Sequence, residues 1–170
     1  FFKGHYLLMA QAIERNDMGQ LKQLAQGQDL SLKGEKDMDL MWFAIARENF
    51  DAIRTLVELG VNPDNQIAQG IGNALQFTFM KHDDVRYLKA MLDGGLSPNH
   101  MHPRQNLMLQ RGVFGGLEHV KLLLQRGTRI NDRDSIGGTA LHTATTSVEP
   151  DIAIYLINQG ADFNTHKTNG

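Results

Sequence analysis

The sequence predicts an all-α solenoid of about five helix-turn-helix units joined by hairpin-like loops, and three observations support this. Segments of similar pattern end at Gly60, Gly95, Gly127 and Gly160, which are spaced by 35, 32 and 33 residues. Before each of these glycines, apolar residues recur at the spacing of a short helix. The 170 residues include 41% hydrophobic and 21% charged residues, as in folded domains. Such short units must stack to bury a core.

The unit at residues 136–164 shows the pattern best. Leu141 and Ala144 are three residues apart and predict one face of a first helix. Pro150 suits the first turn of a second helix, where its missing N–H leaves no helical hydrogen bond unmade. Gly160 ends that helix in the left-handed conformation, which glycine adopts at little cost. The polar residues that follow are typical of a turn.

The same pattern recurs in four earlier units. It predicts a single domain over residues 1–170, with units at 4–31, 36–64, 70–99, 103–131 and 136–164. In the first four units the helix pairs are expected at 6–15 and 18–26, 39–48 and 50–59, 73–81 and 84–93, and 106–114 and 117–126. Helices of about ten residues are marginal alone, so packing between units is expected to stabilise them.

The last unit carries two recognisable motifs, Thr139-Ala140-Leu141-His142 and Gly160-Ala161-Asp162-Phe163-Asn164. At these residues the chain resembles the ankyrin repeat family, in a degenerate form of bacterial type, and the resemblance extends over about residues 6–164. It implies a stack whose turn tips and first helices line a concave groove that binds a protein partner. One departure is Arg111-Gly112, which stands where the family has two alanines. This departure predicts an irregular junction before the fourth unit.

Composition narrows the function. The net charge is −2 and the isoelectric point is about 6.4, so no strong positive field attracts nucleic acid or acidic lipid. The absence of cysteine excludes disulfides and thiolate metal sites. No apolar run approaches the roughly 20 residues that span a bilayer. We therefore expect no cofactor, no nucleic-acid partner, no membrane-spanning segment and no small-molecule substrate.

Histidines and carboxylates give no strong sign of an enzyme. His100 and His102 could chelate a metal from an extended loop, but no third ligand is near, and a polar loop is the simpler interpretation. The resemblance gives His142 a structural role in holding the turns. Asp83 and Asp84 are interpreted as the start of a helix, where carboxylates cap free N–H groups. We expect no catalytic and no metal site.

Partner-binding side chains are therefore expected on the first helices and turn tips. Counting along the units assigns Phe43 and Phe77 to equivalent positions, and likewise Arg47, Lys81 and Phe114, so that they form a ladder on one face. Exposed aromatic and arginine side chains are favoured anchors of interfaces, although Phe77 could instead pack between units. The full candidate set is Lys36, Met38, Phe43, Arg47, Phe77, Met80, Lys81, His102, Gln105, Arg111, Val113, Phe114, Ser135, Ile136 and Thr146.

The resemblance favours a non-catalytic protein that binds a specific protein partner. Small degenerate ankyrin proteins are similar to bacterial immunity proteins, which predicts a toxin inhibitor that occludes a type VI secretion effector such as a phospholipase. One alternative is a cytosolic scaffold or adaptor in a larger complex. A less favoured alternative is a small enzyme or metal-binding protein that uses His100 and His102. Fold alone does not decide among these functions.

The compartment is a separate expectation. The sequence begins with Phe1 and Phe2 rather than with methionine. Removal of a signal peptide would explain this start and would place the protein in the periplasm. A shortened expression product explains it equally simply, so the cytoplasm stays open as the alternative.

Overall fold

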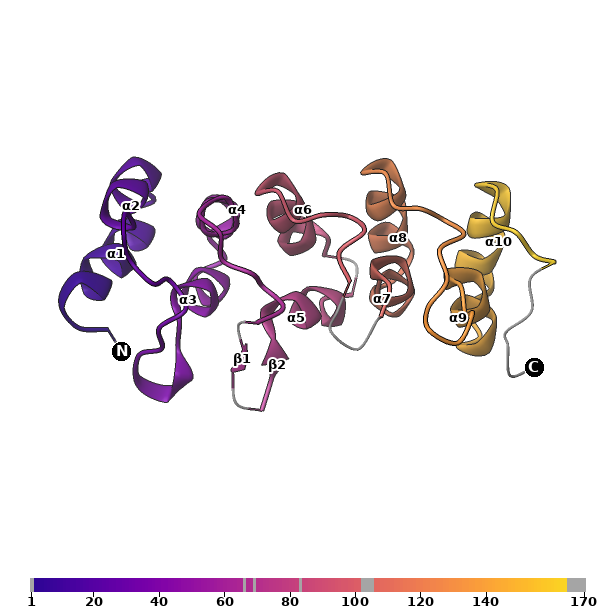
Figure 1. Cartoon of the computed structure of the whole chain (residues 1–170), viewed down its shortest axis with the longest axis horizontal. Coiled ribbons are helices and arrows are strands. Elements are labelled where there is room, and N and C mark those ends of the chain that lie inside the picture. Colours follow the sequence, from indigo (N-terminus) through magenta and orange to yellow (C-terminus); the bar gives the residue numbers. More distant parts are fainter. Residues whose placement is uncertain (1, 66, 69, 83, 102–105, 165–170) are drawn as a thin grey trace. The chain divides into compact units, whose positions relative to one another are not determined.

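The computed structural model describes residues 2–65, 67–68, 70–82, 84–101 and 106–164, and ten α-helices and one short hairpin lie in these ranges (Figure 1). The helices form consecutive pairs, one pair to each of the five repeats. The elements are α1 Gly4–Glu14, α2 Met18–Leu24, the 3₁₀ turn η1 Glu35–Asp37, α3 Leu40–Ala46, α4 Phe50–Glu58, β1 Ile67–Ala68, β2 Gly72–Asn73, α5 Ala74–Met80, α6 Arg86–Asp93, α7 Met108–Gly115, α8 Leu117–Gln125, α9 Ala140–Thr146 and α10 Pro150–Asn158. The predicted helix pairs are confirmed, with ends that differ by at most two residues.

The repeats gather into two compact modules. The N-terminal module comprises the chain up to Thr78 together with Arg86–Leu96, and the C-terminal module comprises Phe79–Val85 together with the chain from Ser97. Each module has its own core of apolar side chains from paired helices. Fully buried members include Ile13, Leu56 and Leu88 in the first module and Leu123 and Leu156 in the second.

The first helices of the second, third and fifth repeats begin at a polar cap that the sequence encodes. Asp39 accepts a hydrogen bond from the Trp42 N–H at 2.8 Å, and Asn73 accepts one from the Gln76 N–H at 2.7 Å. Thr139 starts α9 with a capping box, in which its own N–H donates to Nδ1 of His142 at 3.0 Å. Side-chain acceptors at this position satisfy N–H groups that the helix leaves without partners. His142 therefore serves the helix start, as the resemblance implied.

The fourth repeat starts its first helix differently. Leu107 occupies the cap position, and its N–H donates to Oε1 of Gln110 at 3.3 Å. The Gln110 amide also donates to the Asp134 carboxylate at 2.8 Å and to the Gly138 carbonyl oxygen at 3.3 Å. Gln110 thus takes the place of the histidine of the fifth repeat and joins the start of α7 to the turn tip before α9.

Asparagine side chains join the ends of successive repeats. Oδ1 of Asn99 accepts from the Arg129 N–H at 3.0 Å, and its amide donates to the Gly127 carbonyl oxygen at 3.3 Å. Oδ1 of Asn131 accepts from the Asp162 N–H at 2.8 Å in the same way. The polar residues that predicted turns therefore also connect one repeat to the next.

Two local changes accompany the unequal repeat lengths. The third repeat contains the antiparallel hairpin β1–β2, with Ile67 opposite Asn73, where the sequence predicted only a hairpin-like loop. The fourth repeat has a tighter turn between its helices: the Gly116 N–H donates to the carbonyl oxygen of Gly112, four residues earlier, whereas in the second repeat the Asn49 N–H donates to that of Ala44, five residues earlier. An inserted hairpin and a shortened turn fit the spacings of 35 and 32 residues.

Candidate partner-binding surface

Exposure along the first helices separates the side chains available to a partner from those that hold the repeats together. With the cap residue counted as position one, Ala46, Met80, Phe114 and Thr146 all stand at position eight. All four are exposed. Positions five and eight share one face of a helix because they are three residues apart. This count also corrects the predicted ladder: Phe114 is equivalent to Met80, and not to Arg47 and Lys81, which stand at position nine.

The exposed positions of the C-terminal module form a group that we call the exposed row. It comprises positions five, eight, nine and ten of the third to fifth repeats, as far as they lie in this module; these residues are exposed or half-buried, except for the buried Gly115. The Met80 and Phe114 side chains are 56% and 61% exposed. Nδ1 of His82 lies 3.2 Å from the Gly115 carbonyl oxygen, which brings the ends of α5 and α7 together. Helices α7 and α9 also pack side by side, so the row continues from repeat to repeat.

Arg111 belongs to the exposed row and is half-buried. Its guanidinium group lies over the Phe79 ring, 5.5 Å from the ring centroid. The buried His119 ring lies on the same phenylalanine, with the two centroids 5.8 Å apart. A guanidinium group stacked on an aromatic ring covers the ring and gains a cation–π contact. Arg111 therefore packs against Phe79 without making the helix α7 irregular.

Val113 was expected on the surface, and this prediction is wrong. The side chain is only 2% exposed. Position seven of the helix faces the core, whereas Phe114 at the next position faces outward. Thr146 is exposed as expected, and its hydroxyl donates to the His142 carbonyl oxygen at 2.7 Å.

In the N-terminal module the expected binding residues mostly contact their own module. Arg47 forms a salt bridge with Glu14, and its guanidinium group lies 5.4 Å from the centroid of the Phe43 ring. Phe43 is half-buried, and the Phe2 ring meets it edge to face. The salt bridge joins opposite charges, so this face attracts a charged partner less strongly.

Phe77 contributes to packing rather than to an open surface. Its ring meets Trp42 and Tyr87 edge to face, with centroid distances of 5.5 and 5.7 Å. These contacts tie α3, α5 and α6 together. Sequence reasoning left this alternative open, and the structure decides it in favour of packing.

The turn tips give a mixed result. Lys36 is exposed in η1, and Met38 after it is half-buried. Ser135 and Ile136 are exposed at the tip before α9, where the Ile136 N–H donates to Asp134 at 3.0 Å. The remaining two candidates lie outside the described residues: His102 and Gln105.

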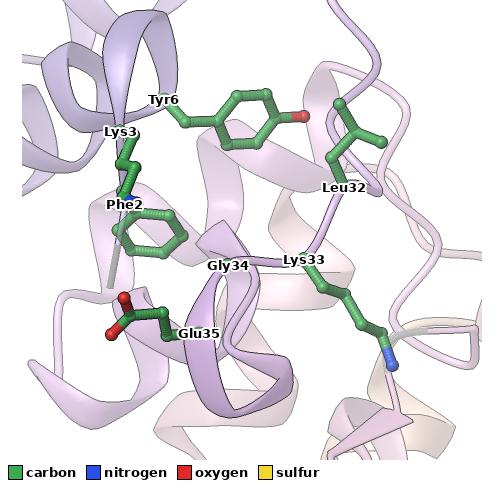
Figure 2. A pocket seen from close by; sticks show the side chains of 7 residues that line it. All are labelled: Phe2, Lys3, Tyr6, Leu32, Lys33, Gly34 and Glu35. Carbon is green, nitrogen blue, oxygen red and sulfur yellow. The ribbon is translucent and has the colours of Figure 1, made fainter.

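A pocket at the first repeat was not expected from the sequence. The cavity has a volume of about 340 Å³, and Figure 2 shows the Tyr6 ring facing Leu32, with Phe2 and Glu35 on the other side. Its lining is Phe2, Lys3, Tyr6, Leu32, Lys33, Gly34 and Glu35. The pocket forms where the loop at residues 32–35 passes α1, and no local motif marks such a packing. Its walls combine aromatic rings with charges of both signs, so it selects no ligand class.

Two titratable groups near this pocket have shifted pKa values. Burial raises the pKa of Asp39, whose side chain is fully buried at the start of α3. Burial also raises the pKa of the Tyr6 hydroxyl, and the nearby Asp29 and Asp39 carboxylates add to the increase. Both shifts follow from packing of the first two repeats.

The described part of the chain holds neither a metal-binding cluster nor a membrane-spanning helix. Across the described ranges, no three histidine or carboxylate side chains gather closely enough to hold a metal ion. Within the same ranges, none of the helices combines the length and apolar character needed to cross a membrane. His100 is described, but its proposed companion His102 is not.

Known proteins give a consistent picture of the fold. No family model matches the chain. The chain is 42% identical over 76 residues to protein phosphatase 1 regulatory subunit 27 of Mus musculus, covering 44% of this chain and 49% of that protein. It thus spans about half the length of that relative. Protein PhlB of Serratia liquefaciens is 30% identical over 147 residues, covering 84% of this chain and 63% of PhlB.

Two further similarities identify the repeat. Ankyrin repeat and SAM domain-containing protein 6 of Rattus norvegicus is 32% identical over 99 residues, covering 55% of this chain and 11% of that protein. The ankyrin repeat domain of Bcl-3, a member of the IkappaB family, superposes with a TM-score of 0.52 at 17% identity, covering 95% of this chain and 90% of that domain. With paired helices in each repeat and glycines that end the second helices at Gly60, Gly95, Gly127 and Gly160, the chain is an ankyrin repeat protein.

Proposed function

We propose that this ankyrin repeat protein is a bacterial immunity protein that binds a secreted antibacterial toxin and blocks its active site. The observation that carries the proposal is the exposed row, where Met80 and Phe114 stand open to solvent at equivalent positions of adjacent repeats. Large apolar side chains that are exposed together mark protein-binding surfaces. An interaction module of this kind needs no catalytic group of its own.

Two relatives support parts of this proposal. PhlB, which matches most of this chain, comes from a bacterium. The mouse relative is by its name a regulatory subunit of an enzyme, which fits a protein that acts by binding one. We propose further that the inhibited enzyme is a toxin of a type VI secretion system that acts in the periplasm, such as a phospholipase. The inhibitor would then be periplasmic too.

Occlusion is the mechanism that this surface favours. A standard protein interface buries roughly 1,600 Å² in total, about half of it on each partner. Side chains from several repeats, each contributing a position-eight residue and a turn tip, would form the binding side of such an interface. Covering the mouth of an active site excludes substrate without any chemical step on the inhibitor.

The test is inhibition of an enzyme that the chain captures. The purified chain is used to capture proteins from the secreted fraction of the source bacterium, and the captured enzyme is then assayed with increasing amounts of the chain. We expect loss of activity at equimolar inhibitor and protection of cells that express the toxin. Capture of a partner whose activity stays unchanged contradicts the proposal and favours the adaptor function.

A matched pair of variants ties inhibition to the exposed row. Phe114→Ala removes a 61% exposed ring from the row, and Phe163→Ala removes a 68% exposed ring from the end loop of the fifth repeat. Truncating a central interface aromatic typically costs upwards of about 2 kcal/mol of binding free energy. We expect Phe114→Ala to weaken inhibition more than tenfold and Phe163→Ala to leave it unchanged. Equal effects of the two variants would exclude the row as the binding site.

A further inference from the structure

The second helix of the fifth repeat, α10, exposes large apolar side chains, which the second helices of the earlier repeats do not. Ile154 is 58% exposed and Ile157 is 42% exposed. The two residues are three positions apart and therefore share one face of the helix. Ile152 and Leu156, by contrast, are buried in the core of the module. We call the face that Ile154 and Ile157 define the outer face of α10; the sequence predicted no binding residue there.

The position of Ile154 is cationic in all four earlier repeats. When the second helices are aligned on their caps and end glycines, the residues equivalent to Ile154 are Lys22, Arg54, Lys89 and Lys121. Each of these cations forms a salt bridge, with nitrogen–oxygen distances of 2.8 to 3.8 Å. The fifth repeat therefore has an exposed isoleucine where the other repeats have a solvated ion pair.

Packing of a further repeat does not explain this isoleucine. The four equivalent cations have side chains that are 36 to 56% exposed, although another repeat follows each of them. The position of Ile157 differs, because the next repeat covers it: Leu92 is buried there, and Cβ of Val57 would lie 2.7 Å from a methyl group added at Gly94 of the next repeat. An occupant that covers both isoleucines must therefore lie along the outer side of α10.

The polar groups of α10 fit a second copy of the same helix. Asp151 is the single charged residue among the nine residues of α10, and it lies in the first turn. Asn158 and Gln159 are exposed at the other end and carry amide groups, which donate hydrogen bonds. In an antiparallel pair of α10 helices, Asp151 of one copy comes beside these amides of the other copy. The antiparallel arrangement also opposes the two helix dipoles, so the outer face is complementary to itself.

We propose that the outer face of α10 binds a second copy of this chain, in a twofold-symmetric dimer whose two α10 helices pack antiparallel. Ile154 and Ile157 form the centre of the contact and are removed from water there. Twofold dimers are the commonest homo-oligomers, and the same surface patch serves both copies. The outer face shares no residue with the exposed row, so the proposal goes beyond the proposed function and does not depend on it.

Analytical ultracentrifugation of the purified chain measures the association. We expect the average mass to rise with concentration from 19.0 kDa toward twice that value, and no further. Because the contact is mainly apolar, added salt should not dissociate the dimer. A mass that stays at 19.0 kDa up to about 1 mM, the weak end of measurable affinities, would overturn the proposal.

A matched pair of variants locates the contact. Ile154→Lys restores the kind of residue that the earlier repeats have at this position, three residues after Asp151, so the helix itself should be unharmed. Phe114→Lys introduces the same charge at a 61% exposed apolar side chain on α7. We expect Ile154→Lys to weaken dimerisation more than tenfold and Phe114→Lys to leave it unchanged, with circular dichroism confirming both folds. Full dimerisation of Ile154→Lys would refute the assignment to α10.

Cysteine crosslinking tests the symmetry of the contact. The chain has no cysteine, so a single introduced thiol can form a disulfide only between two copies. In a twofold contact a residue near the axis lies close to its own equivalent, as disulfide geometry requires. We expect Ile154→Cys to form a covalent dimer more than tenfold faster than Phe114→Cys on mild oxidation. Equal rates for the two variants would exclude the antiparallel pairing of α10.

A different protein is the other possible occupant of the outer face. If the wild-type chain stays monomeric but captures a secreted protein that Ile154→Lys does not capture, the face binds that protein and the proposed dimer is wrong. Inhibition of a captured enzyme provides the separate readout for the proposed function. Monomeric Ile154→Lys should inhibit as well as the wild type. Dimerisation without inhibition of any enzyme would defeat the proposed function and leave the dimer standing.

Discussion

At the scale of one residue, the buried carboxylate of Asp39 stabilises the start of a helix but, when charged, destabilises the folded protein. Asp39 caps α3 through the Trp42 N–H, but its side chain is fully buried and its other oxygen has no hydrogen-bond partner. Burial raises its pKa, so the folded state holds the proton more tightly than the unfolded chain does. Stability from this group is full below the ordinary aspartate pKa and is lost as pH rises through the raised value.

We predict that Asp39→Asn stabilises the protein at neutral pH. Asparagine keeps the cap, as Asn73 does at the equivalent position of α5, and carries no charge to bury. The gain should vanish as pH falls below the carboxyl range, because the wild-type group is then neutral too. Urea unfolding at several pH values measures this. Asp39→Ala should instead lose about 1 kcal/mol by removing the cap, and a gain from Asn that does not change with pH would rule out burial of charge as its cause.

A second prediction concerns the strained backbone at Val148. Val148→Asn should raise the free energy of unfolding by about 1 kcal/mol, because asparagine tolerates the left-handed region and the exposed valine makes little packing contact. Thermal unfolding measures the gain. If the row binds a partner, the same variant should bind it less tightly, as a trade of function for stability. A variant that is no more stable would show that the valine is not strained.

At the scale of one residue, the sequence predicted some side chains well and others wrongly. Phe114 was expected to be exposed and is, whereas its neighbour Val113 was misplaced. A helix turns by about 100° per residue, so an error of one position in the register exchanges a surface residue for a core residue. Phe77 could not be assigned from its repeat position, because the rings that enclose it come from Trp42 and Tyr87 on other helices.

At the scale of helices, the fourth repeat shows why its glycines are needed. A methyl group added at Gly112 would lie 2.7 Å from Cδ1 of Leu123, and one added at Gly115 would lie 2.9 Å from Cγ of His119. Because these two glycines carry no side chain, Leu123 and His119 of α8 pack directly against the backbone of α7. The sequence predicted an irregular junction at Arg111-Gly112, where the family has two alanines. Instead, the Leu123 side chain fills the space at Gly112 that an alanine side chain would occupy. Restoring alanine is thus expected to crowd the core.

Leu123→Ala and Gly112→Ala together test this packing. Leu123→Ala alone should cost about 2–5 kcal/mol by leaving a cavity. In a Gly112→Ala background the cost should be smaller, because the added methyl group occupies part of that cavity, and the two effects should not add. Chemical denaturation of the four proteins in the cycle gives the coupling energy. Strict additivity would show that the two positions do not share one space.

At the scale of the whole molecule, the division into two modules predicts how far along the chain a destabilising substitution acts. Each repeat contacts mainly its neighbours, so a defect in one module should not spread evenly along the chain. In Leu123→Ala we expect faster hydrogen exchange in α7–α10 and nearly unchanged exchange in α1–α4. Mass spectrometry of peptic fragments measures this. Uniform acceleration along the chain would mean that the protein unfolds as one unit.

The stack as a whole was predictable from the sequence, and the surface chemistry only in part. Glycines such as Gly127 and Gly160, with φ angles of 93° and 95°, mark the repeat ends plainly. The pocket beside Tyr6 was not predictable, since it depends on how a loop passes a helix.

The asparagines that join successive repeats have a consequence for how such a chain changes over generations. Asn99 and Asn131 each stand four residues after a glycine, at Gly95 and Gly127. Each then reaches the loop of the next repeat. The hairpin of the third repeat and the inter-helix turn of the fourth differ in length from the same segments of other repeats, whereas these end loops have the same length. The end loops thereby fix the spacing between successive repeats. New sequence for recognising a different partner can therefore be inserted at the hairpins without disturbing the packing of the helices.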